Sequence, residues 1–577
     1  MTVPPLIRAR VLPMLLGTAL LCAVPVTLLA ELTVRVDGVT GALRDNVARH
    51  IGTPLSDDPR ILRRFAARAE ENAQRGLQAL GYYHATVTTR LEGEPGNRVL
   101  QVDVDPGEPT RIRRLDIRLD GEAEDDRAFV AVIEAIALRE GDVLHHGRYE
   151  SAKRSIESTA LTRGYFDGRF QTSRISISRE RREADITLHY ISGPRYKLGA
   201  VRFPEMPVTQ SLMQRLVPFS EGDPYHSESV ARLNRNLLNS GYFSEVRVRP
   251  QEAVDHVIPV VAELTEARPN RMDVGLGYAT DVGPRLRLGW RKPYVTEDGH
   301  SLRTETEISE VRQSLSGVYS MPLDPPLEHQ LQFVGGWQRE KLDDTDSEKL
   351  TAAIQRQRQL TRGWQQTLFL RWEREKFEVG GRRDETTLTL PGSTLSRTRS
   401  RGGMDPHWGD RQTATVTATH PELGSDVQLS RVRLESRWLR TYGRHRGLVR
   451  AEVGALFTED FDRTPVSLRF ATGGDQSVRG YAYQSLGPRD DRGDLIRGRY
   501  LAVASAEYGY QVANNWRLAT FYDVGNAFDD WGDSLKEGAG FGVRWISPVG
   551  PIRLDFAWGI SERDTPFRLH FSMGPEI

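Results

Sequence analysis

Cysteine is almost absent from this chain, in which Cys22 is the only one among 577 residues. Cys22 lies in an apolar N-terminal segment that we expect to be removed, so the mature chain would contain no cysteine. This absence excludes disulfides, thiol nucleophiles and cysteine-ligated metals from the mature protein. Such a composition suits a compartment in which stray thiols become oxidised.

The chain also lacks an excess of charge of either sign, with 78 basic and 78 acidic residues. A balanced chain has no overall electrostatic attraction to nucleic acid, so we expect no nucleic-acid partner. Beyond residue 30 no run of 18 or more consecutive apolar residues occurs, so no membrane-spanning helix is expected there. The mean hydropathy of −0.49 resembles that of a soluble protein. A β-barrel can have the same value, because its lipid-facing and lumen-facing residues alternate.

The first 30 residues have the features of an export signal. Arg8 and Arg10 precede a largely apolar stretch over residues 11–29. We therefore expect residues 1–30 to be a signal peptide. A single N-terminal transmembrane anchor is the alternative, although prolines in and beside the apolar stretch would disturb a straight helix.

A glycine followed by two aromatic residues occurs three times, at residues 81–83, 164–166 and 241–243. Each copy ends a segment with helical periodicity and precedes an alternating strand pattern. Glycine at such a position suits a left-handed helix C-cap, where a residue with a Cβ atom would be strained. One copy would mean little, but three copies in the same context indicate a repeat.

Two further matches support the repeat. Residues 107–117 align without gaps with residues 193–203, and the Glu-Gly-Asp tripeptide at 140–142 recurs at 221–223. We predict three α+β units, each in the order strand, helix, helix, strand, strand (βααββ). Their expected boundaries are residues 31–107, 108–193 and 194–267.

From residue 268 onward, the helical period gives way to alternation of apolar and polar residues. Leu368, Leu370 and Trp372, for example, share one face of a strand. Segments of about ten residues with one apolar and one polar face match the tilted strands of a transmembrane β-barrel. A soluble sandwich or propeller would alternate as well, but the export signal and the aromatic residues near strand ends favour the membrane.

The predicted barrel domain, residues 268–577, holds 577 − 267 = 310 residues. At roughly 20 residues per strand and loop this length allows about 14 to 16 antiparallel strands, and we expect 16. The first strand, expected near residues 272–279, and the last, expected near residues 567–573, must pair to close the barrel. Glycine and proline at these strands should weaken the pairing and create a lateral seam. The seam residues are Gly275, Gly277, Gly574 and Pro575.

Residues 473–481 end in a Val-Arg-Gly-Tyr motif that resembles the signature loop of the Omp85 superfamily of outer-membrane assembly and translocation proteins. Residues 521–525 and 540–557 resemble the second motif and the C-terminal block of that superfamily. The resemblance implies that the three α+β units are periplasmic POTRA domains. It also implies that the barrel lies in a bacterial outer membrane.

Within the superfamily, three POTRA units are most similar to the branch of the TamA subunits of translocation and assembly modules. Runs that resemble this branch are residues 216–219, 277–285, 396–403 and 574–577. The resemblance implies a factor that helps to insert or secrete autotransporters and other β-barrel proteins. It further implies a TamB-like inner-membrane-anchored partner, unfolded outer-membrane clients and contact with outer-membrane lipids.

The superfamily resemblance also implies that the loop carrying Arg479 folds back into the barrel lumen. Alternation in residues 521–525 places Phe521 and Asp523 on one side, so an inward Asp523 would meet Arg479. A bidentate pair in a confined lumen should be stronger than a surface pair. Considered alone, an Arg-Gly turn is usually a solvated hairpin loop. The expected lumen-loop lock comprises Val478, Arg479, Gly480, Tyr481, Asp523, Gly525 and Arg544.

Other signals favour simpler interpretations. His145 and His146 have no third ligand at a suitable spacing, so we expect neither a metal nor any other cofactor. The glycines at 538, 540 and 542 leave one face of a strand bare and do not form a phosphate loop. The arginines in residues 397–401 could touch lipopolysaccharide phosphates or occupy a solvated loop.

No nucleophile, base and orienting group occur together in the sequence, so we do not expect an enzyme. Two other classes of protein nevertheless remain open. One is a passive secretion pore of the two-partner secretion type, and the other is an outer-membrane lipase.

Overall fold

The computed structural model describes residues 32–573 except 55–57, 95–97, 343 and 549. The expected signal peptide and the seam residues Gly574 and Pro575 lie outside the described residues. Two compact units form the chain, Met1–Tyr196 and Lys197–Ile577. Within the described residues, no helix is long and apolar enough to cross a membrane.

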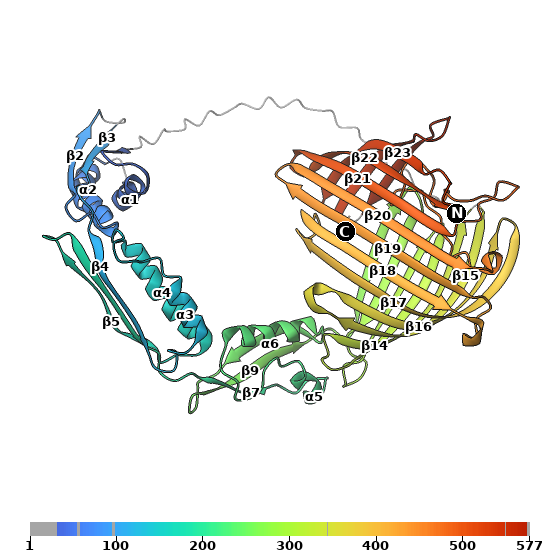
Figure 1. Cartoon of the computed structure of the whole chain (residues 1–577), viewed down its shortest axis with the longest axis horizontal. Helices are drawn as coiled ribbons and strands as arrows, with labels where there is room; N and C mark the ends of the chain where they lie inside the picture. The colour runs from blue at the N-terminus through green and yellow to red at the C-terminus, as the bar shows by residue number, and fades with distance from the viewer. Residues whose placement is uncertain (1–31, 55–57, 95–97, 343, 549, 574–577) are drawn as a thin grey trace, which may run out of the picture. The chain divides into compact units, whose positions relative to one another are not determined.

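The first compact unit contains two successive βααββ repeats (Figure 1). Repeat 1 consists of β1 (Thr33–Asp37), α1 (Gly41–Ile51), α2 (Pro59–Ala79), β2 (Thr86–Glu92) and β3 (Val99–Asp105). Repeat 2 consists of β4 (Arg111–Asp120), α3 (Arg127–Glu134), α4 (His146–Arg163), β5 (Arg169–Ser178) and β6 (Glu183–Ile191). The predicted order of elements is therefore confirmed in both.

In each repeat the last strand lies in the middle of a three-stranded sheet, giving the orders β1-β3-β2 and β4-β6-β5. The middle strand runs parallel to the first strand and antiparallel to the second. Helical Val47 and Leu77 pack with Leu100 and Val102 of β3, and all four side chains are buried. This apolar layer joins the helices to the sheet and leaves the outer strands as unpaired sheet edges.

The second compact unit begins with repeat 3, whose sheet order β7-β9-β8 repeats the same topology. Its elements are β7 (Lys197–Arg202), α5 (Gln210–Gln214), α6 (Ser227–Asn239), β8 (Phe243–Pro250) and β9 (Val257–Glu266). The glycines that follow the long helices, Gly81, Gly164 and Gly241, have φ angles of 92°, 87° and 76°. These left-handed conformations explain why glycine recurs at this point of each repeat.

Residues 271–573 form a closed barrel of 16 strands, as predicted (Figure 1). Its first half comprises β10 (Arg271–Ala279), β11 (Gly283–Lys292), β12 (Ser301–Ser309), β13 (Arg312–Pro322), β14 (His329–Leu342), β15 (Thr345–Gln359), β16 (Gln365–Val379) and β17 (Arg382–Arg401). Its second half comprises β18 (Trp408–Thr419), β19 (Leu429–Tyr442), β20 (His445–Thr458), β21 (Tyr500–Ala513), β22 (Trp516–Phe528), β23 (Lys536–Ser547), β24 (Gly550–Gly559) and β25 (Phe567–Met573). Short 3₁₀ helices lie at η1 (Thr361–Gly363), η2 (Pro421–Leu423) and η3 (Phe461–Arg463).

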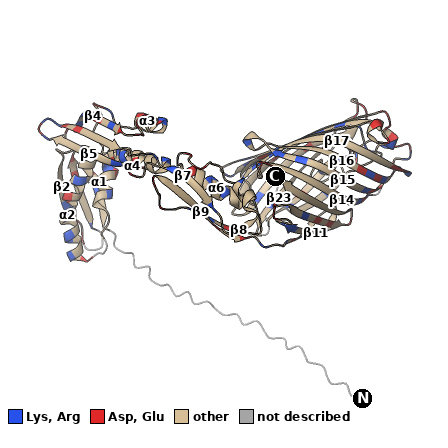
Figure 2. Cartoon of the chain, turned by 90° about the horizontal axis from the view of Figure 1, so that it is seen from below, with Lys and Arg blue, Asp and Glu red and all other residues tan. Residues whose placement is uncertain are grey.

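The barrel wall alternates between an apolar outer face and a polar inner face. In β16, Leu368 and Leu370 are 47% and 48% exposed on the outside, whereas Glu373 and Glu375 are buried on the inside. Figure 2 shows both signs of charge along the chain, without a face dominated by one sign. An apolar exterior around a polar lumen is the arrangement of a barrel that spans a bilayer.

Repeat 3 packs on the turn between β11 and β12. The Tyr242 hydroxyl donates to the carbonyl of Gly299 at 3.0 Å, and the Thr209 N–H donates to the Glu297 carbonyl at 2.8 Å. We call the barrel end that carries this turn the proximal end. Because turns alternate between the two ends of an antiparallel barrel, the β10–β11 turn and the long β20–β21 loop lie at the distal end.

Candidate functional site: the lumen loop and the barrel seam

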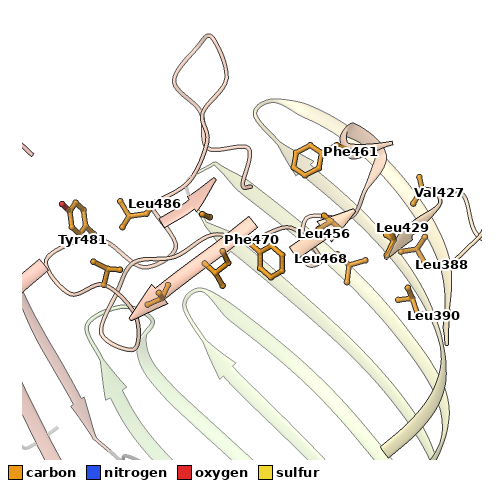
Figure 3. Close-up of a cluster of buried hydrophobic side chains, with 14 residues drawn as sticks. Leu388, Leu390, Val427, Leu429, Leu456, Phe461, Leu468, Phe470, Tyr481 and Leu486 are labelled. Carbon is orange, nitrogen blue, oxygen red and sulfur yellow. The ribbon is translucent and has the colours of Figure 1, made fainter. Parts of the chain in front are cut away.

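The loop over residues 459–499, between β20 and β21, packs against the inner wall of the barrel. Figure 3 shows apolar loop side chains, among them Leu468 and Phe470, beside wall residues such as Leu429 and Leu456. All of these side chains are buried. The wall therefore has an apolar inner patch where the loop covers it, in contrast to its otherwise polar lumen.

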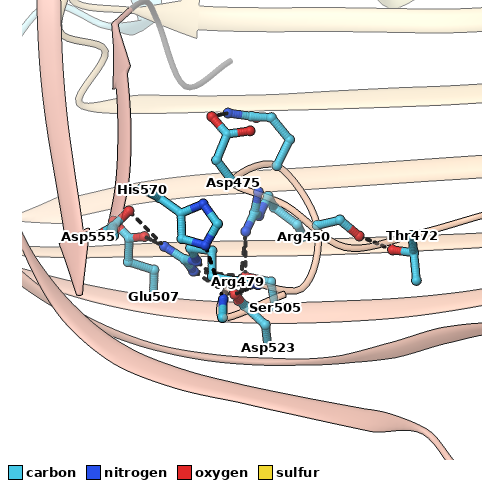
Figure 4. Close-up of polar contacts among 12 residues, drawn as sticks. Arg450, Thr472, Asp475, Arg479, Ser505, Glu507, Asp523, Asp555 and His570 are labelled. Atoms are coloured by element: carbon cyan, nitrogen blue, oxygen red, sulfur yellow. Dashed lines mark hydrogen bonds and ion pairs between the residues drawn. The ribbon is translucent and has the colours of Figure 1, made fainter. Parts of the chain in front are cut away.

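Arg479 lies at the centre of the loop contact and is only 2% exposed. Its Nε donates to Asp523 Oδ2 at 2.7 Å and its second terminal nitrogen donates to Oδ1 at 2.9 Å (Figure 4). The Arg479 backbone N–H also donates to Asp523 Oδ2, at 3.1 Å. The guanidinium carbon lies 3.4 Å from the centre of the Phe521 ring. The structure thus brings together Arg479 and Asp523 in the bidentate geometry that the sequence predicts.

Further carboxylates complete the charge balance around Arg479. Glu507 accepts from Arg479 at 2.7 Å and from Arg544 at 2.9 Å, so it bridges the two guanidinium groups. Asp555 lies 2.6 Å from Arg544 and 3.5 Å from Arg479. Arg544 therefore joins the predicted network through Glu507 and Asp555 rather than through Asp523.

A third arginine approaches from β20. Arg450 lies 3.7 Å from Asp523 and donates to the Ser505 hydroxyl at 3.0 Å. Ser505 in turn donates to Asp523 at 2.6 Å. Ion pairs withdrawn from water are stable only where the surrounding groups satisfy the remaining donors and acceptors, and this network largely meets that condition.

Glycines clear the space in which the loop lies. Gly480 has a φ angle of 94°, and a Cβ atom there would stand 2.6 Å from the backbone nitrogen of Gly559. A Cβ atom on Gly538 would stand 2.0 Å from the carbonyl oxygen of Arg479. The bare strand face noted in the sequence is therefore the surface against which the signature motif rests.

The remaining predicted lock residues also lie on the wall. Val478 is fully buried, and the Tyr481 hydroxyl donates to the carbonyl of Glu537 at 3.3 Å. Gly525 lies in β22 and does not contact the loop motif in the same way. A Cβ atom there would stand 2.6 Å from the carbonyl oxygen of Ala502 on β21, so this glycine serves the close approach of two strands.

The barrel closes through very little pairing between β10 and β25. Among the described residues the only Cα partners are Ala279 and Ser572, whereas β10 and β11 share nine such pairs. Two hydrogen bonds add to the closure: Thr280 N–H to the Phe571 carbonyl at 3.1 Å, and Phe571 N–H to Thr280 Oγ1 at 2.8 Å. The described pairing between the first and last strands is therefore short, and the lateral seam stays a prediction.

A Cβ atom on either described seam glycine would make only ordinary van der Waals contacts. The nearest atoms to a Cβ built on Gly275 or Gly277 are 3.7 Å away, on Arg287 and Arg285. Packing therefore does not require glycine at either position. Their effect is to leave β10 more flexible next to the edge that must pair with β25.

The lumen loop also bridges the two sides of the seam. The Gly480 N–H donates to His570 Nε2 on β25 at 3.1 Å, and His570 Nδ1 lies 3.5 Å from Asp281 in the β10–β11 turn. The Asp475 N–H donates to Asp281 Oδ2 at 2.6 Å. We call Asp281, Asp475, Gly480 and His570 the seam bridge. A displaced loop would lose these contacts to both edge strands at once.

Sequence reasoning missed seven of these polar residues. They are Asp281, Arg450, Asp475, Ser505, Glu507, Asp555 and His570. Five of them, Arg450, Ser505, Glu507, Asp555 and His570, lie on the inner faces of strands, so the alternation of apolar and polar residues could have indicated them. Asp281 lies in a turn and Asp475 in the lumen loop, where alternation gives no information.

The histidine pair is structural. The N–H of Arg148 donates to His145 Nδ1 at 3.3 Å, at the start of α4, and His146 Nε2 lies 2.6 Å from the Tyr83 hydroxyl. Burial lowers the pKa of His146. Within the part of the chain that the structure describes, no three His, Cys, Asp or Glu side chains are grouped to hold a metal.

The fold and the site together define a class of protein: a membrane-type β-barrel preceded by α+β repeats and plugged by an anchored loop. The profile of the Omp85 superfamily domain matches residues 268–577. This match covers more than half of the chain, which therefore belongs to the Omp85 superfamily. Residues 33–106 match the profile of TamA POTRA domain 1, and residues 196–267 match the surface antigen variable number repeat, a POTRA profile.

Several curated and solved proteins are similar to this chain. The outer membrane protein assembly factor BamA of Nitratidesulfovibrio vulgaris is 35% identical over 23% of this chain and 18% of its own length. BamA of Neorickettsia risticii is 22% identical over 74% of this chain and 61% of its own length. The chain thus spans less than two thirds of these relatives. The crystal structure of Haemophilus ducreyi BamA lacking POTRA domains 1–3 has a TM-score of 0.67 at 16% identity, covering 81% of this chain and 99% of that chain.

Proposed function

We propose that this protein is an outer-membrane assembly and translocation factor that inserts or secretes autotransporters and other β-barrel proteins. One observation carries the proposal: the barrel is plugged by a loop held in a buried ion network, yet its described first and last strands share a single pair of Cα partners. A plug keeps the membrane sealed. A short seam permits opening toward the lipid without unfolding the wall.

The seam supplies a template for client strands. Separation of β10 from β25 would expose the unpaired N–H and C=O groups of both edges. An incoming β-hairpin can pair with such an edge through main-chain hydrogen bonds, which require little sequence specificity. The outer faces of Met272, Val274 and Leu276 on β10 are 77%, 70% and 75% exposed, so a client strand paired there would already face lipid.

The three α+β repeats act as periplasmic POTRA domains in this proposal, with domains over residues 31–107, 108–193 and 194–267. Each has two sheet edges that can accept an extended client segment. The TamA-type profile over residues 33–106 supports a TamB-like inner-membrane-anchored partner at the first POTRA domain. Repeat 3 would pass the client onward, because it rests directly on the barrel turn at Gly299.

Depletion of the protein in its native cell tests the proposal. Autotransporters and other β-barrel proteins should fall in abundance in the outer membrane or accumulate unfolded, whereas periplasmic proteins should not. Re-expression of the intact chain should restore them. Unchanged abundance and folding of all β-barrel proteins after depletion would contradict an assembly role.

A passive secretion pore of the two-partner type is the second candidate, because the barrel encloses a lumen. The two functions differ in conductance. An assembly factor plugged as described here should give little steady current in a planar bilayer, whereas a pore should give a stable open state. We propose no enzymatic activity, and labelling of the purified chain by a serine-reactive probe would contradict this.

A further inference from the structure

A cluster of arginines and tryptophans lies on the outer wall near the proximal end of the barrel. Arg397, Arg399 and Arg401 occupy the end of β17, which is a strand and not the solvated loop that the sequence left open. Their Cα partners on β18 are Gln412, Asp410 and Trp408. Strands β17, β18 and β19 lie side by side in Figure 1.

Register places this cluster on the lipid side of the wall. Leu434 and Val453 are Cα partners and are 44% and 47% exposed, which marks the outer face of β19. Alternate residues of a strand share a face, so Trp438 and Arg440 face outward as well. Arg440 is the Cα partner of Trp408. Trp408 and its other Cα partner, Arg401, therefore face outward too, and Arg397 and Arg399 share the face of Arg401 on β17. All four arginines face lipid rather than the lumen.

The charges of the cluster are not balanced. Three guanidinium groups surround the ring of Trp408: those of Arg401, Arg440 and Arg399, at 4.8 Å, 4.6 Å and 5.3 Å from its centre. Such contacts are individually favourable, but the guanidinium groups repel one another. Asp410 is the only carboxylate paired with the cluster among the described residues, and it is fully buried against Arg397 and Arg399. Four arginines therefore face one carboxylate.

An apolar indentation adjoins the charged cluster. Its volume is about 340 Å³, and Trp364, Leu395, Ala414, Leu434, Ala451 and Val453 line it. The guanidinium of Arg397 lies 4.6 Å from the centre of the Trp364 ring, at the boundary between the two regions. The small side chains of Ala414 and Ala451 leave room for the hollow between the larger side chains of Leu395, Leu434 and Val453. A basic group beside an apolar hollow fits a ligand with an anionic head and an acyl chain.

We propose that this surface binds an anionic phospholipid, with its phosphate at Arg401 and Arg440 and one acyl chain in the indentation. The choice of phospholipid rests on the proposed function, because periplasmic POTRA domains place the proximal end in the phospholipid leaflet. Lipopolysaccharide belongs to the opposite leaflet. Guanidinium groups bind phosphate oxygens by paired hydrogen bonds, and tryptophan is favoured at the lipid headgroup level.

A bound lipid of this kind would have a place in the assembly reaction. The cluster lies at the strand ends where the wall meets the headgroups, so a lipid held there orders the bilayer against the barrel. Anchoring the proximal rim would leave the seam, on other strands, as the part of the wall that moves when a client enters.

Native mass spectrometry of the full chain tests the proposal. The chain would be released from bilayers of phosphatidylglycerol and phosphatidylethanolamine in equal amounts, and its retained lipids counted. The preference for phosphatidylglycerol should fall about thirtyfold in the Arg401→Gln/Arg440→Gln variant, since each arginine contributes about 1 kcal/mol to binding an anionic lipid. Ala451→Phe, which fills the indentation, should also lower retention, whereas Ala352→Phe on the outer face of β15 should not.

A matched control removes the same charge at the same end of the barrel. Arg356 and Arg358 lie at the proximal end of β15 and share the outer face of Ile354. The Arg356→Gln/Arg358→Gln variant should keep the preference. An equal loss in both double variants, or an unchanged preference in the first, would overturn the proposed site.

Two competition experiments distinguish a phospholipid from other phosphate-containing ligands. Excess inorganic phosphate should not displace the retained lipid, and lipopolysaccharide should not replace it. Displacement by either would overturn the assignment to a phospholipid. Client assembly would be measured separately on the same variants. If the unmutated chain retained the lipid but assembled no client, the result would count against the proposed function and not against the lipid site.

Discussion

At the scale of single residues, the Arg479–Asp523 pair shows how burial makes an ion pair asymmetric in its energetics. Removing two charges from water costs several kcal/mol per ion, so the intact pair adds modestly to stability. Removing only one partner leaves the other buried without its counter-charge. Glu507 can compensate part of an orphaned Arg479, whereas an orphaned Asp523 keeps the Ser505 hydroxyl and the more distant Arg450.

The first prediction is a double-mutant cycle on this pair. Arg479→Ala or Asp523→Ala should each destabilise the folded barrel by about 3–5 kcal/mol, because each leaves a buried charge without its main partner. The double variant should lose no more than the worse single variant. The measurement is the temperature at which the purified barrel no longer migrates as the folded species in gel electrophoresis. Purely additive losses of stability would argue against a coupled pair.

Arg479→Lys is the matched control for charge. Lysine keeps the positive charge but cannot make the two parallel hydrogen bonds of the guanidinium group to Asp523. We expect it to fall between the wild-type chain and Arg479→Ala. Equal behaviour of lysine and arginine would show that charge alone holds the loop.

The second prediction concerns the bare face of β23. Gly538→Ala would place a Cβ atom 2.0 Å from the carbonyl oxygen of Arg479. Because this distance is far too short, the loop must move away from the wall. Conductance in a planar bilayer should rise as the plug loosens. Gly335→Ala is the control, since a Cβ atom there meets no atom within 4 Å. Equal conductance of the two variants would mean that the loop does not seal the lumen.

At the scale of elements, Asp126 joins the ends of two helices in repeat 2. Its carboxylate accepts from the Ala128 N–H at 3.0 Å at the start of α3, and from Arg163 at 2.6 Å at the end of α4. The Tyr165 hydroxyl donates to it at 3.2 Å. Burial alone would raise the pKa of Asp126, but the Ala128 N–H and Arg163 outweigh it and lower the pKa below its usual range.

The third prediction follows from that lowered pKa. A carboxylate with a lower pKa in the folded state stabilises the fold fully above its unfolded-state pKa of about 4. This stability is lost as the pH falls through the lower, folded-state value. Hydrogen exchange of residues 127–134 in the full chain should therefore show protection that declines below about pH 4. Asp126→Asn should remove most of this pH dependence while retaining the helix cap, and an unchanged profile in that variant would contradict the assignment.

The elements differ in how far the sequence predicted them. The βααββ repeats followed from periodicity and from the glycines after each long helix, because a left-handed C-cap imposes a residue type that the sequence displays. The first and last barrel strands also lie within a residue of their expected positions, 272–279 and 567–573. These strands were predictable because apolar and polar residues alternate with a period of two, which is the period at which successive side chains of a strand face lipid and lumen.

The contacts of the lumen loop were predictable only in part. Arg479 and Asp523 were paired because both belong to motifs that resemble a known family. His570 and Asp281 come from strands and turns nearly 290 residues apart in the chain (570 − 281 = 289). Their meeting depends on barrel closure, which is a property of all sixteen strands and leaves no local pattern in the sequence. The arginines of residues 397–401 were similarly ambiguous until register placed them on the outer wall.

At the scale of the whole molecule, the loop and the seam form one closing device. The loop contacts β25 through His570 and the β10–β11 turn through Asp281, so the plugged state and the closed state stabilise each other. Among the described residues the two edges share one Cα pair, so the loop contacts at His570 and Asp281 add substantially to the contacts across the seam. Withdrawal of the loop should therefore favour lateral opening.

Locking the seam tests this account most directly. Ala279→Cys/Ser572→Cys joins the two Cα partners of the seam by a disulfide, and the expected mature chain contains no competing cysteine. Ala504→Cys/Val524→Cys, between β21 and β22, is the matched control within the wall. Insertion of an unfolded β-barrel client into liposomes that contain the oxidised protein is the measurement. We predict that the seam disulfide abolishes insertion, that reduction restores it and that the control disulfide has no effect. Full insertion by the oxidised seam variant would contradict a barrel that opens sideways.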